Sequence, residues 1–421
     1  MIRPSWSLRT LVEDLRAGRT TSAAVWARFR ERVETTDPAL RAWVALAEPP
    51  SSVPGDRPLA GVPLGVKDII DVAGLPTRCG AAVRSDAPPA EADAAIVSAW
   101  RGVGAVPAGK TVTTEFAFFA PGPTANPAAP GHTPGGSSSG SAAAVASGQV
   151  PLALGSQTAG SVTRPASYCG VASLVMSHGR FPVTGVTGLS PSLDSHGVLA
   201  GSVSDLALAW SALTGARDVA VGPLGGPPRI LVWTADPLDV VEEPMRVALA
   251  VAVERLRTAG AVVDPFPEER LVADVTHAHP VVMAFEAARE RADELARAGE
   301  ISDQLAQLLR TGEATSLVDY RAASEVVDVG EETVARLLSS YDVVLGPAAP
   351  GPAPHGLDVT GDPVLSRAWQ AMGLPTVAVP GLTDSHGLPL GVQLIGPSRG
   401  ETDLLGHAAW VERHLTGSLR S

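Results

Sequence analysis

The sequence predicts an α/β protein in which helices cover a mostly buried sheet. Segments with helical spacing alternate along the chain with short apolar runs typical of strands, and this alternation favours the α/β class. Of the 421 residues, 45% are hydrophobic, which is enough for a large core. Between Glu115 and Arg180 the only charged residue is Arg164, although 18% of the whole chain is charged. This stretch is therefore expected to be buried.

The N-terminal part is expected to begin with two helices within residues 7–35. Leu8, Leu11 and Leu15 follow helical spacing, and Thr21 or Ser22 can cap the second helix. Beyond it, an apolar run punctuated by glycine and proline predicts a strand at 59–72. Apolar residues that share one helical face predict a helix at 91–103, and a short apolar run predicts a strand at 105–108.

The rest of the chain continues this alternation. A proline-rich coil at 121–134 precedes a short alanine-rich helix at 141–147, which Gly148 closes. Further helices are expected near 244–259, 282–298, 302–311, 331–340 and 402–415. Further strands are expected at 150–154, 341–345 and 376–379. The block 212–228 is loop-like, but it gives no firm domain boundary.

The charge and the cysteine content exclude several classes of protein. Lysine and arginine number 32 against 44 acidic residues, giving a net charge of −12. No basic stripe is present, so neither nucleic acid nor a membrane is expected as a partner. Cys79 and Cys169 form neither a disulfide framework nor a metal motif. No signal peptide and no transmembrane run is found, so a cytoplasmic location is expected.

The histidines do not indicate a metal site. The nine histidines are scattered along the chain. His277 and His279 could chelate a metal only with ligands from elsewhere. We expect them to be exposed loop residues, and we predict no metal and no cofactor.

Two short motifs suggest other chemistries. Residues 104–111 match the phosphate-loop pattern GxxxxGK[ST], which needs a strand before it and a helix after it. A helix precedes and β-branched residues follow, so a strand end and a turn is the favoured interpretation, with nucleotide binding as an alternative. Residues 136–140 match the nucleophile elbow GxSxG, but the prolines before them cannot form the buried strand that it needs.

Lys67 is a candidate general base. If residues 61–70 form a strand, Lys67 and Asp68 point to opposite faces, with Lys67 on the inward face. Burial lowers the pKa of a lysine, and a neutral lysine can accept a proton near pH 7. A buried pair between Lys67 and a carboxylate explains the same pattern, and on spacing alone it is the favoured interpretation.

Several motifs occur together in one order. A Gly/Ser-rich segment at 134–145 is followed by a second at 151–166, and Lys67 stands in a Val-Lys-Asp sequence. Further landmarks lie at 109–111, 114–117, 192–197, 373–376 and 387–394. This set resembles the amidase signature hydrolases, closely over residues 61–205 and loosely over most of the remaining chain.

The resemblance implies an architecture. The amidase signature fold has a mixed β-sheet core covered by helices on both faces. Residues 1–421 are then expected to form a single domain, with N-terminal helices at 5–46, the core motifs at 61–205 and a variable helical region at about 244–340.

The resemblance also implies a Ser–cisSer–Lys triad. Carried over residue by residue, Ser161 is the nucleophile, Ser137 the relay serine and Lys67 the base. The Gly136–Ser137 peptide bond is then expected to be cis. An oxyanion hole is expected from the backbone N–H groups of Thr158, Ala159, Gly160 and Ser161.

Arg164 bears on the substrate. Many family members carry an arginine two residues after the nucleophile, but this chain has Thr163 there and Arg164 one residue later. This pattern resembles the malonamidase-type branch, where such an arginine binds a substrate carboxylate. A structural ion pair with Asp194 explains Arg164 equally well. Gly136 and Ser138 are further expected binding residues.

The function that the resemblance implies is hydrolysis of the C–N bond of a small amide through an acyl-enzyme, and a carboxylate-bearing amide is one expectation for the substrate. One alternative is the glutaminase-type subunit of a tRNA-dependent amidotransferase, for which the chain is short. Another is a catalytically silent binding protein.

Residues 173–178 replace a Gly-Leu-Lys-Pro-Thr-like stretch of the family, and this replacement is expected to reshape a pocket wall. A homodimer is expected for this family.

Substrate specificity is expected to lie in the segments 270–330 and 352–374. Phe118, Trp369 and Met372 are candidate pocket residues, and ordinary core packing explains each of them as well.

Overall fold

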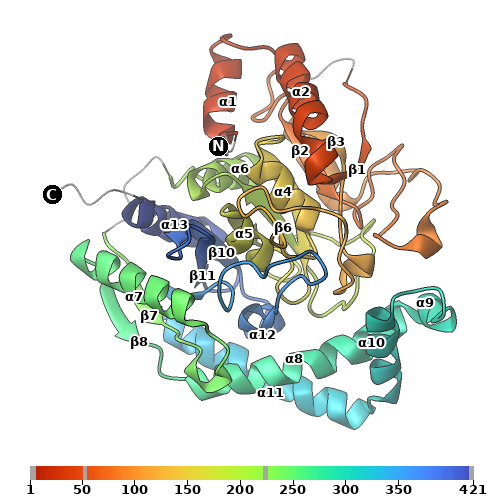
Figure 1. The fold of residues 1–421 in the computed structure, drawn as a ribbon. Coiled ribbons are helices and arrows are strands. Elements are labelled where there is room, and N and C mark those ends of the chain that lie inside the picture. Colours follow the sequence, from red (N-terminus) through yellow and green to blue (C-terminus); the bar gives the residue numbers. More distant parts are fainter. Residues whose placement is uncertain (1–5, 51–54, 221–225, 417–421) are drawn as a thin grey trace.

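The computed structural model describes residues 6–50, 55–220 and 226–416, and these contain one mixed sheet of 11 strands (Figure 1). The strand order is β1-β3-β2-β4-β6-β5-β10-β11-β9-β7-β8. The strands are β1 (Trp43–Leu46), β2 (Pro63–Lys67), β3 (Val106–Thr111), β4 (Leu152–Gln157), β5 (Ala172–Val175), β6 (Ser195–Ala200), β7 (Arg229–Val232), β8 (Val262–Pro265), β9 (Val343–Pro347), β10 (Thr376–Thr383) and β11 (Pro389–Ile395).

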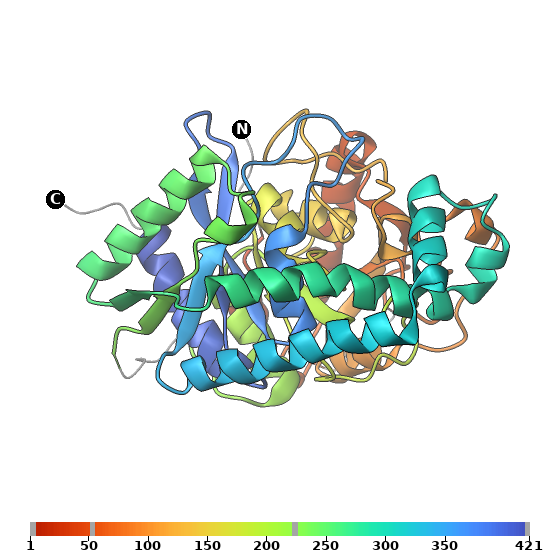
Figure 2. The ribbon, with the colours of Figure 1, turned by 90° about the horizontal axis from the view of Figure 1, so that it is seen from below.

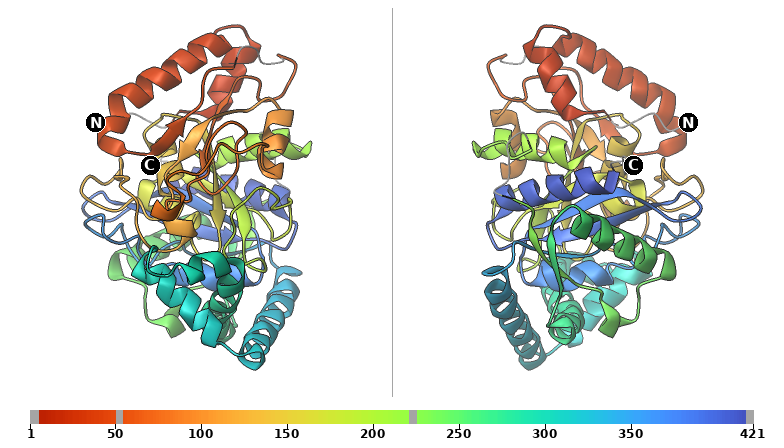
Figure 3. Two further views of the ribbon diagram at one scale, coloured as in Figure 1. Left: turned by 90° about the vertical axis from the view of Figure 1, so that its right-hand side faces the viewer. Right: turned by 90° about the vertical axis from the view of Figure 1, so that its left-hand side faces the viewer.

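Helices cover both faces of this sheet. They are α1 (Leu8–Arg16), α2 (Ser22–Leu40), α3 (Ala95–Gly102), α4 (Ser139–Ala146), α5 (Thr163–Cys169), α6 (Val203–Thr214), α7 (Glu243–Thr258), α8 (Glu269–Glu290), α9 (Ala292–Ala296), α10 (Asp303–Ala314), α11 (Leu317–Leu338), α12 (Val364–Ala371) and α13 (Glu401–Thr416). Helices α4 and α5 pack together on one face, and α6 and α13 pack together on the other (Figure 3). Helices α8 and α11 run side by side (Figure 2). The expected α/β architecture is confirmed.

The charge-free stretch is buried over most of its length, as expected, but residues 117–132 are largely half-buried or exposed. Every residue from 133 to 169 is buried, and this segment contains α4, β4 and α5. Helix α4 is buried on all sides because its side chains are alanine, serine, glycine and one valine, which let neighbouring backbones come close. Two segments with serine hydroxyls are thereby held in the centre of the protein.

Several expected elements differ from those observed. The strand expected at 59–72 is only Pro63–Lys67, whereas the strand expected at 105–108 extends to Thr111. Two helices occupy the place of the helix expected at 282–298. Helix α8 begins at Glu269 and ends at Glu290, and α9 starts at Ala292. Pro280 lies inside α8 without ending it, since buried residues before and after the proline pack this helix against the core.

Other differences concern length. The helix expected at 331–340 is the C-terminal part of α11, and α2, which Thr21 caps, continues past residue 35 to Leu40. The remaining strands were not expected, among them the central pair β5 and β6. Both of these strands are buried on both faces, so they lack the alternation of apolar and polar residues that marks a half-exposed strand.

Candidate active site

Neighbouring strands bring the expected catalytic residues together. Lys67 is the last residue of β2, and β2 pairs in parallel with β4, which ends at Gln157. The carboxyl ends of parallel strands meet at one edge of a sheet, so the turn 157–161 begins beside Lys67. Ser137 lies just before α4, and the Ser138 N–H donates to the Ser161 carbonyl at 3.1 Å.

Lys67 is fully buried and contacts hydroxyl groups rather than a carboxylate. Its Nζ lies 2.6 Å from Ser137 Oγ, 2.9 Å from Ser156 Oγ and 3.2 Å from the Ser156 carbonyl oxygen. Burial lowers the pKa of Lys67 to about 7, although the more distant Asp194 acts to raise it. A substantial fraction of Lys67 is therefore neutral near pH 7.

The lysine–carboxylate pair that the sequence also allowed is formed by a different lysine. Lys110 Nζ lies 2.9 Å from Asp68 Oδ1, and both side chains are buried. Lys110 stands in β3 (Val106–Thr111), so the strand continues to the end of the motif, and the turn at residues 103–104 lies before the strand rather than after it. No phosphate loop is formed there, because the Lys110 ammonium is inaccessible and a strand occupies the place of the loop.

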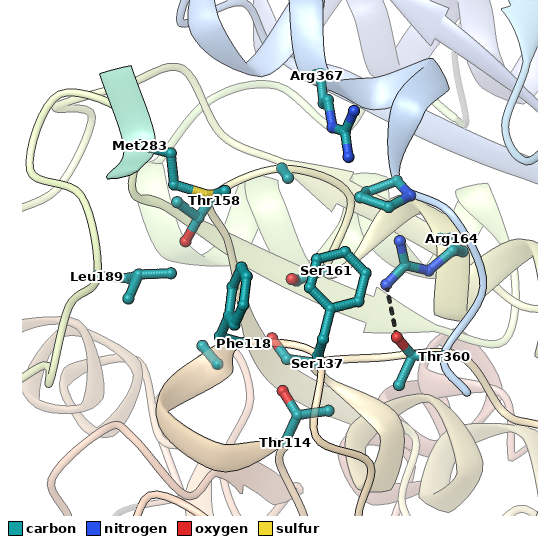
Figure 4. A pocket seen from close by; sticks show the side chains of 14 residues that line it. Thr114, Phe118, Ser137, Thr158, Ser161, Arg164, Leu189, Met283, Thr360 and Arg367 are labelled. Atoms are coloured by element: carbon teal, nitrogen blue, oxygen red, sulfur yellow. Dashed lines mark hydrogen bonds between the residues drawn. The ribbon is translucent and has the colours of Figure 1, made fainter. Parts of the chain in front are cut away.

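Ser161 shares a pocket with Ser137 but makes no hydrogen bond to its hydroxyl in this structure. Both serines line the same pocket, into which their side chains point (Figure 4). The Gly136–Ser137 bond is cis, as the resemblance led us to expect. The structure thus brings Lys67 into direct contact with Ser137, and it brings Ser137 and Ser161 into one pocket.

The turn 157–161 is held from its sides. Gln157 Oε1 accepts hydrogen bonds from the N–H groups of Val162 and Thr163 at 2.9 and 3.0 Å. Thr158 Oγ1 donates to Asp194 Oδ1 at 2.5 Å. Among the described residues, no acceptor is found for the backbone N–H groups of residues 158–161. These donors are available to a ligand.

His279 contacts the same turn. It is a buried residue of α8, not the exposed loop residue that we expected, whereas His277 is exposed. Burial lowers the pKa of His279 to about 4, so the ring is neutral at pH 7 and its Nε2–H donates to the Thr158 carbonyl at 2.8 Å. No sequence pattern indicated this role, because the helix was expected to start after residue 279.

Gly160 lies against α12. A Cβ atom at this position would lie 2.9 Å from Pro363 Cβ and 3.1 Å from Pro363 Cα, so glycine is needed for the close approach of the turn to this helix.

Arg164 is buried and only partly satisfied. Its Nη2 donates to the Gly136 carbonyl at 2.7 Å and to Thr360 Oγ1 at 3.3 Å. Its Nε and Nη1 have no hydrogen-bond partner among the described residues. The ion pair with Asp194 that the sequence allowed is absent, because Asp194 instead accepts hydrogen bonds from the Thr158 hydroxyl and from the backbone N–H groups of Leu189 and Ser190. Burial lowers the pKa of Arg164 to about 10, so it is still charged at pH 7.

The pocket has an apolar wall and a cationic wall, with about 400 Å³ of free space including its open mouth. Phe118, Phe119, Leu189 and Met283 form the apolar wall, and Arg164 and Arg367 belong to the cationic wall (Figure 4). Arg367, on α12, was not expected individually, but it lies in the segment 352–374 where substrate specificity was expected, and Met283 lies in the other such segment, 270–330.

Other expected binding residues do not line this pocket. The Gly136 carbonyl is taken by Arg164, and the Ser138 hydroxyl donates to the Ser156 carbonyl at 3.4 Å. Of the three candidate pocket residues, Phe118 lines the pocket. Trp369 instead packs in the core against Trp233, and Met372 lines a different cavity.

The described residues contain neither a metal-binding cluster nor a helix suited to crossing a membrane. No group of three or more histidine, cysteine, aspartate or glutamate side chains in residues 6–50, 55–220 and 226–416 could hold a metal ion. Within those same ranges, no helix is long and apolar enough to cross a membrane.

Comparisons with known proteins identify a family that matches most of the chain. The family model described as Amidase matches residues 39–405. A 2-amino-5-chloromuconic acid deaminase of Comamonas testosteroni is 33% identical, over 84% of this chain and 82% of its own. A solved amidase structure with 28% identity superposes with a TM-score of 0.86, over 97% of this chain and 100% of that one.

An amidotransferase component is also among the relatives. The matching component of the glutamyl-tRNA(Gln) amidotransferase from Rhodopirellula baltica is 29% identical, over 95% of this chain and 94% of its own. The length of this chain therefore does not separate it from that component. The family match and these relatives show that the chain belongs to the Amidase family, and it is an enzyme that hydrolyses carbon–nitrogen bonds of amides.

Proposed function

We propose that Ser161, Ser137 and Lys67 hydrolyse a small amide whose acyl part carries a carboxylate. The observation that carries this proposal is the 2.6 Å distance between Ser137 Oγ and the Nζ of Lys67, a buried lysine whose pKa is about 7, because Ser137 lines the same pocket as Ser161. A buried amine without a paired carboxylate can accept a proton near neutral pH, which serine attack on an amide requires.

The reaction begins with proton transfer. Neutral Lys67 takes the proton of Ser137 as Ser137 takes that of Ser161, and the Ser161 oxygen forms a bond to the amide carbon. The C–N bond then breaks, and the proton returns through Ser137 to the leaving amine. Water, activated in the same way, cleaves the Ser161 ester and releases the acid.

The turn 157–161 supports the charge that develops in this reaction. The backbone N–H groups of residues 158–161 have no acceptor among the described residues, so they can donate to the oxyanion of the tetrahedral intermediate. One such donor is typically worth about 3–4 kcal/mol to the transition state. Because the turn is fixed by Gln157, Asp194 and His279, its donors need little rearrangement.

Arg164 is the proposed partner of the carboxylate. A guanidinium binds a carboxylate through two N–H groups, and two nitrogens of Arg164 lack partners among the described residues. The charge of an unpaired buried arginine is costly, and a carboxylate in the pocket offsets this cost. The muconic acid derivative named for the Comamonas relative is itself a carboxylic acid.

An activity screen with acetamide, malonamate and glutamine tests the proposal. We expect malonamate to be hydrolysed with the highest kcat/KM, and Ser161→Ala to remove both turnover and labelling by a fluorophosphonate while leaving the melting temperature close to that of the parent. Turnover that survives in Ser161→Ala contradicts the proposed nucleophile.

Glutamine is the arm of this screen that tests the second candidate function. The match to the amidotransferase component favours release of ammonia from glutamine to a partner protein. Glutamine hydrolysis that is faster than malonamate hydrolysis supports that function instead.

A homodimer and a cytoplasmic location are further parts of the proposal, drawn from the family resemblance and from the sequence-based expectations above. Light scattering of the purified protein measures the former, and cell fractionation the latter. The single-domain organisation of residues 1–421 is proposed on the same resemblance, and one cooperative unfolding transition is the expected result.

A further inference from the structure

A second guanidinium faces the pocket that contains Ser161. Arg164 comes from α5 and Arg367 from α12, and both line this pocket. None of the described residues that line it is acidic. The described wall of this pocket therefore carries two positive charges and no negative charge, although the chain as a whole has a net charge of −12.

The Arg367 guanidinium has few hydrogen-bond partners among the described residues. Its Nε is buried without a hydrogen-bond partner among the described residues. The nearest carboxylate is Asp362, whose Oδ1 lies 3.7 Å from Nη2, beyond the range of a good hydrogen bond. The Asp362 side chain is 56% exposed and that of Arg367 only 23%, so the pair is loose and lies at the edge of the pocket.

The two arginines occupy different depths. Arg164 is fully buried and is fixed by Gly136 and Thr360, whereas Arg367 remains partly accessible. Figure 4 shows Arg164 beside Thr360 and Arg367 on a separate helix, with its guanidinium turned toward the pocket. One group can therefore bind an anion deep in the pocket while the other binds an anion nearer to its mouth.

We propose that Arg367 forms a second anion subsite, so that the preferred substrates are amides with two carboxylates. The inner carboxylate binds Arg164 and the outer one binds Arg367, where it replaces the loose contact with Asp362. This assignment rests on the proposed function, because it takes Ser161 as the reacting group and Arg164 as the first anion site. A dianion also neutralises both the buried Arg164 and the partly accessible Arg367, which a monoanion cannot do.

Three probes separate the sources of the outer carboxylate. Malonamate carries one carboxylate, and the monoamide of tricarballylic acid carries two in its acyl part. N-malonylglycine carries one in the acyl part and one in the leaving amine. We expect at least one of the two dianions to exceed malonamate in kcat/KM by about tenfold or more, because a hydrogen bond to a charged group is worth about 1.5–3 kcal/mol.

Arg367→Gln is expected to lower the ratio of kcat/KM for the preferred dianion to that for malonamate by about 10- to 100-fold, mainly through KM. Arg367→Lys, which keeps a positive charge, is expected to retain part of this ratio. Arg336→Gln on α11 is the matched control, because it removes an exposed arginine and should leave the ratio unchanged. Labelling by a fluorophosphonate shows that each variant is folded around Ser161.

The inference is overturned if neither dianion is preferred, or if Arg367→Gln lowers kcat/KM equally for malonamate and both dianions. Ser161→Ala separates this failure from that of the proposed function. If Ser161→Ala is inactive and the ratio does not respond to Arg367→Gln, only the second subsite is wrong. If Ser161→Ala is still active, the proposed function itself is wrong.

Discussion

The pH dependence of kcat/KM tests whether Lys67 is the general base. With a pKa of about 7, about one-tenth of Lys67 is neutral at pH 6 and about nine-tenths at pH 8. Because only the neutral amine accepts a proton, kcat/KM should rise about tenfold between these two values and then level off. An ordinary exposed lysine, with a pKa near 10.5, would give a limb that still rises above pH 9.

The assay is hydrolysis of malonamate at low concentration from pH 5.5 to 9, since kcat/KM reports the ionisation of the free enzyme. Two other groups of the site titrate outside this range, because burial brings the pKa of His279 to about 4 and that of Arg164 to about 10. Glu412 is the appropriate control. Burial raises its pKa to about 7, but it lies on α13 and bonds to the Val203 N–H.

Glu412→Gln should therefore keep the limb, whereas Lys67→Arg, which cannot lose its proton near pH 7, should lose activity at least about 100-fold. A value of kcat/KM that stays flat between pH 6 and 8 refutes the assignment of Lys67. The same conclusion follows if Glu412→Gln abolishes the limb.

Three further outcomes are expected. Lys67 has a lower pKa in the folded than in the unfolded chain, so the unfolded chain binds more protons between pH 7 and 10.5. The free energy of unfolding should therefore rise by about 5 kcal/mol across this range relative to that of Lys67→Met. Urea unfolding that gives the same pH dependence of this free energy for both proteins would contradict the prediction. His279→Leu should lower kcat about tenfold or more with a smaller effect on KM, and His279→Gln, which keeps an N–H donor, should restore part of it, with exposed His277→Gln as the control. Lys110→Met leaves the Asp68 carboxylate buried without its partner and should destabilise the protein by about 3–5 kcal/mol, as measured by the urea midpoint; a loss below about 1 kcal/mol would show that this ion pair is not maintained in solution.

The sequence predicted the buried centre better than the edges of the elements. The absence of charge between Glu115 and Arg180 depends only on composition, and it correctly indicated burial of both serine segments. Strand ends depend on pairing with neighbours distant in sequence, so the strand that ends at Lys67 was expected to begin four residues too early and to end five residues too late. Short strands buried on both faces have no periodic pattern to recognise.

Phe118 and the segments 270–330 and 352–374 were expected to contribute to the pocket, but most individual residues of its wall could not be predicted for a similar reason. Arg367 lies on a short helix, and nothing in its local sequence distinguishes an arginine that faces a pocket from one that faces solvent. Its role depends on the packing of α12 against the turn 157–161, where Gly160 meets Pro363. His279 likewise acts only because α8 crosses the site, and the segment 173–178, expected to reshape a wall, contributes no residue to the lining of this pocket.

Two buried lysines on adjacent strands show how this fold controls charge. Lys67 and Lys110 are both fully buried, and β2 and β3 pair in parallel so that Val66 lies opposite Lys110. Lys110 has Asp68 at 2.9 Å, whereas the partners of Lys67 are the hydroxyl and carbonyl oxygens of serines. Burial disfavours both ammonium groups, but only that of Lys110 has an adjacent carboxylate to offset the cost.

The position of Asp68 therefore matters for the reaction as well as for stability. As the residue after Lys67, it is the nearest carboxylate in sequence, and a contact between the two would hold the proton on Lys67. Lys110 and the Arg78 N–H instead bind the Asp68 carboxylate, which leaves Lys67 with neutral neighbours. By this reasoning the charge state of the proposed base depends on an ion pair in which the base takes no part.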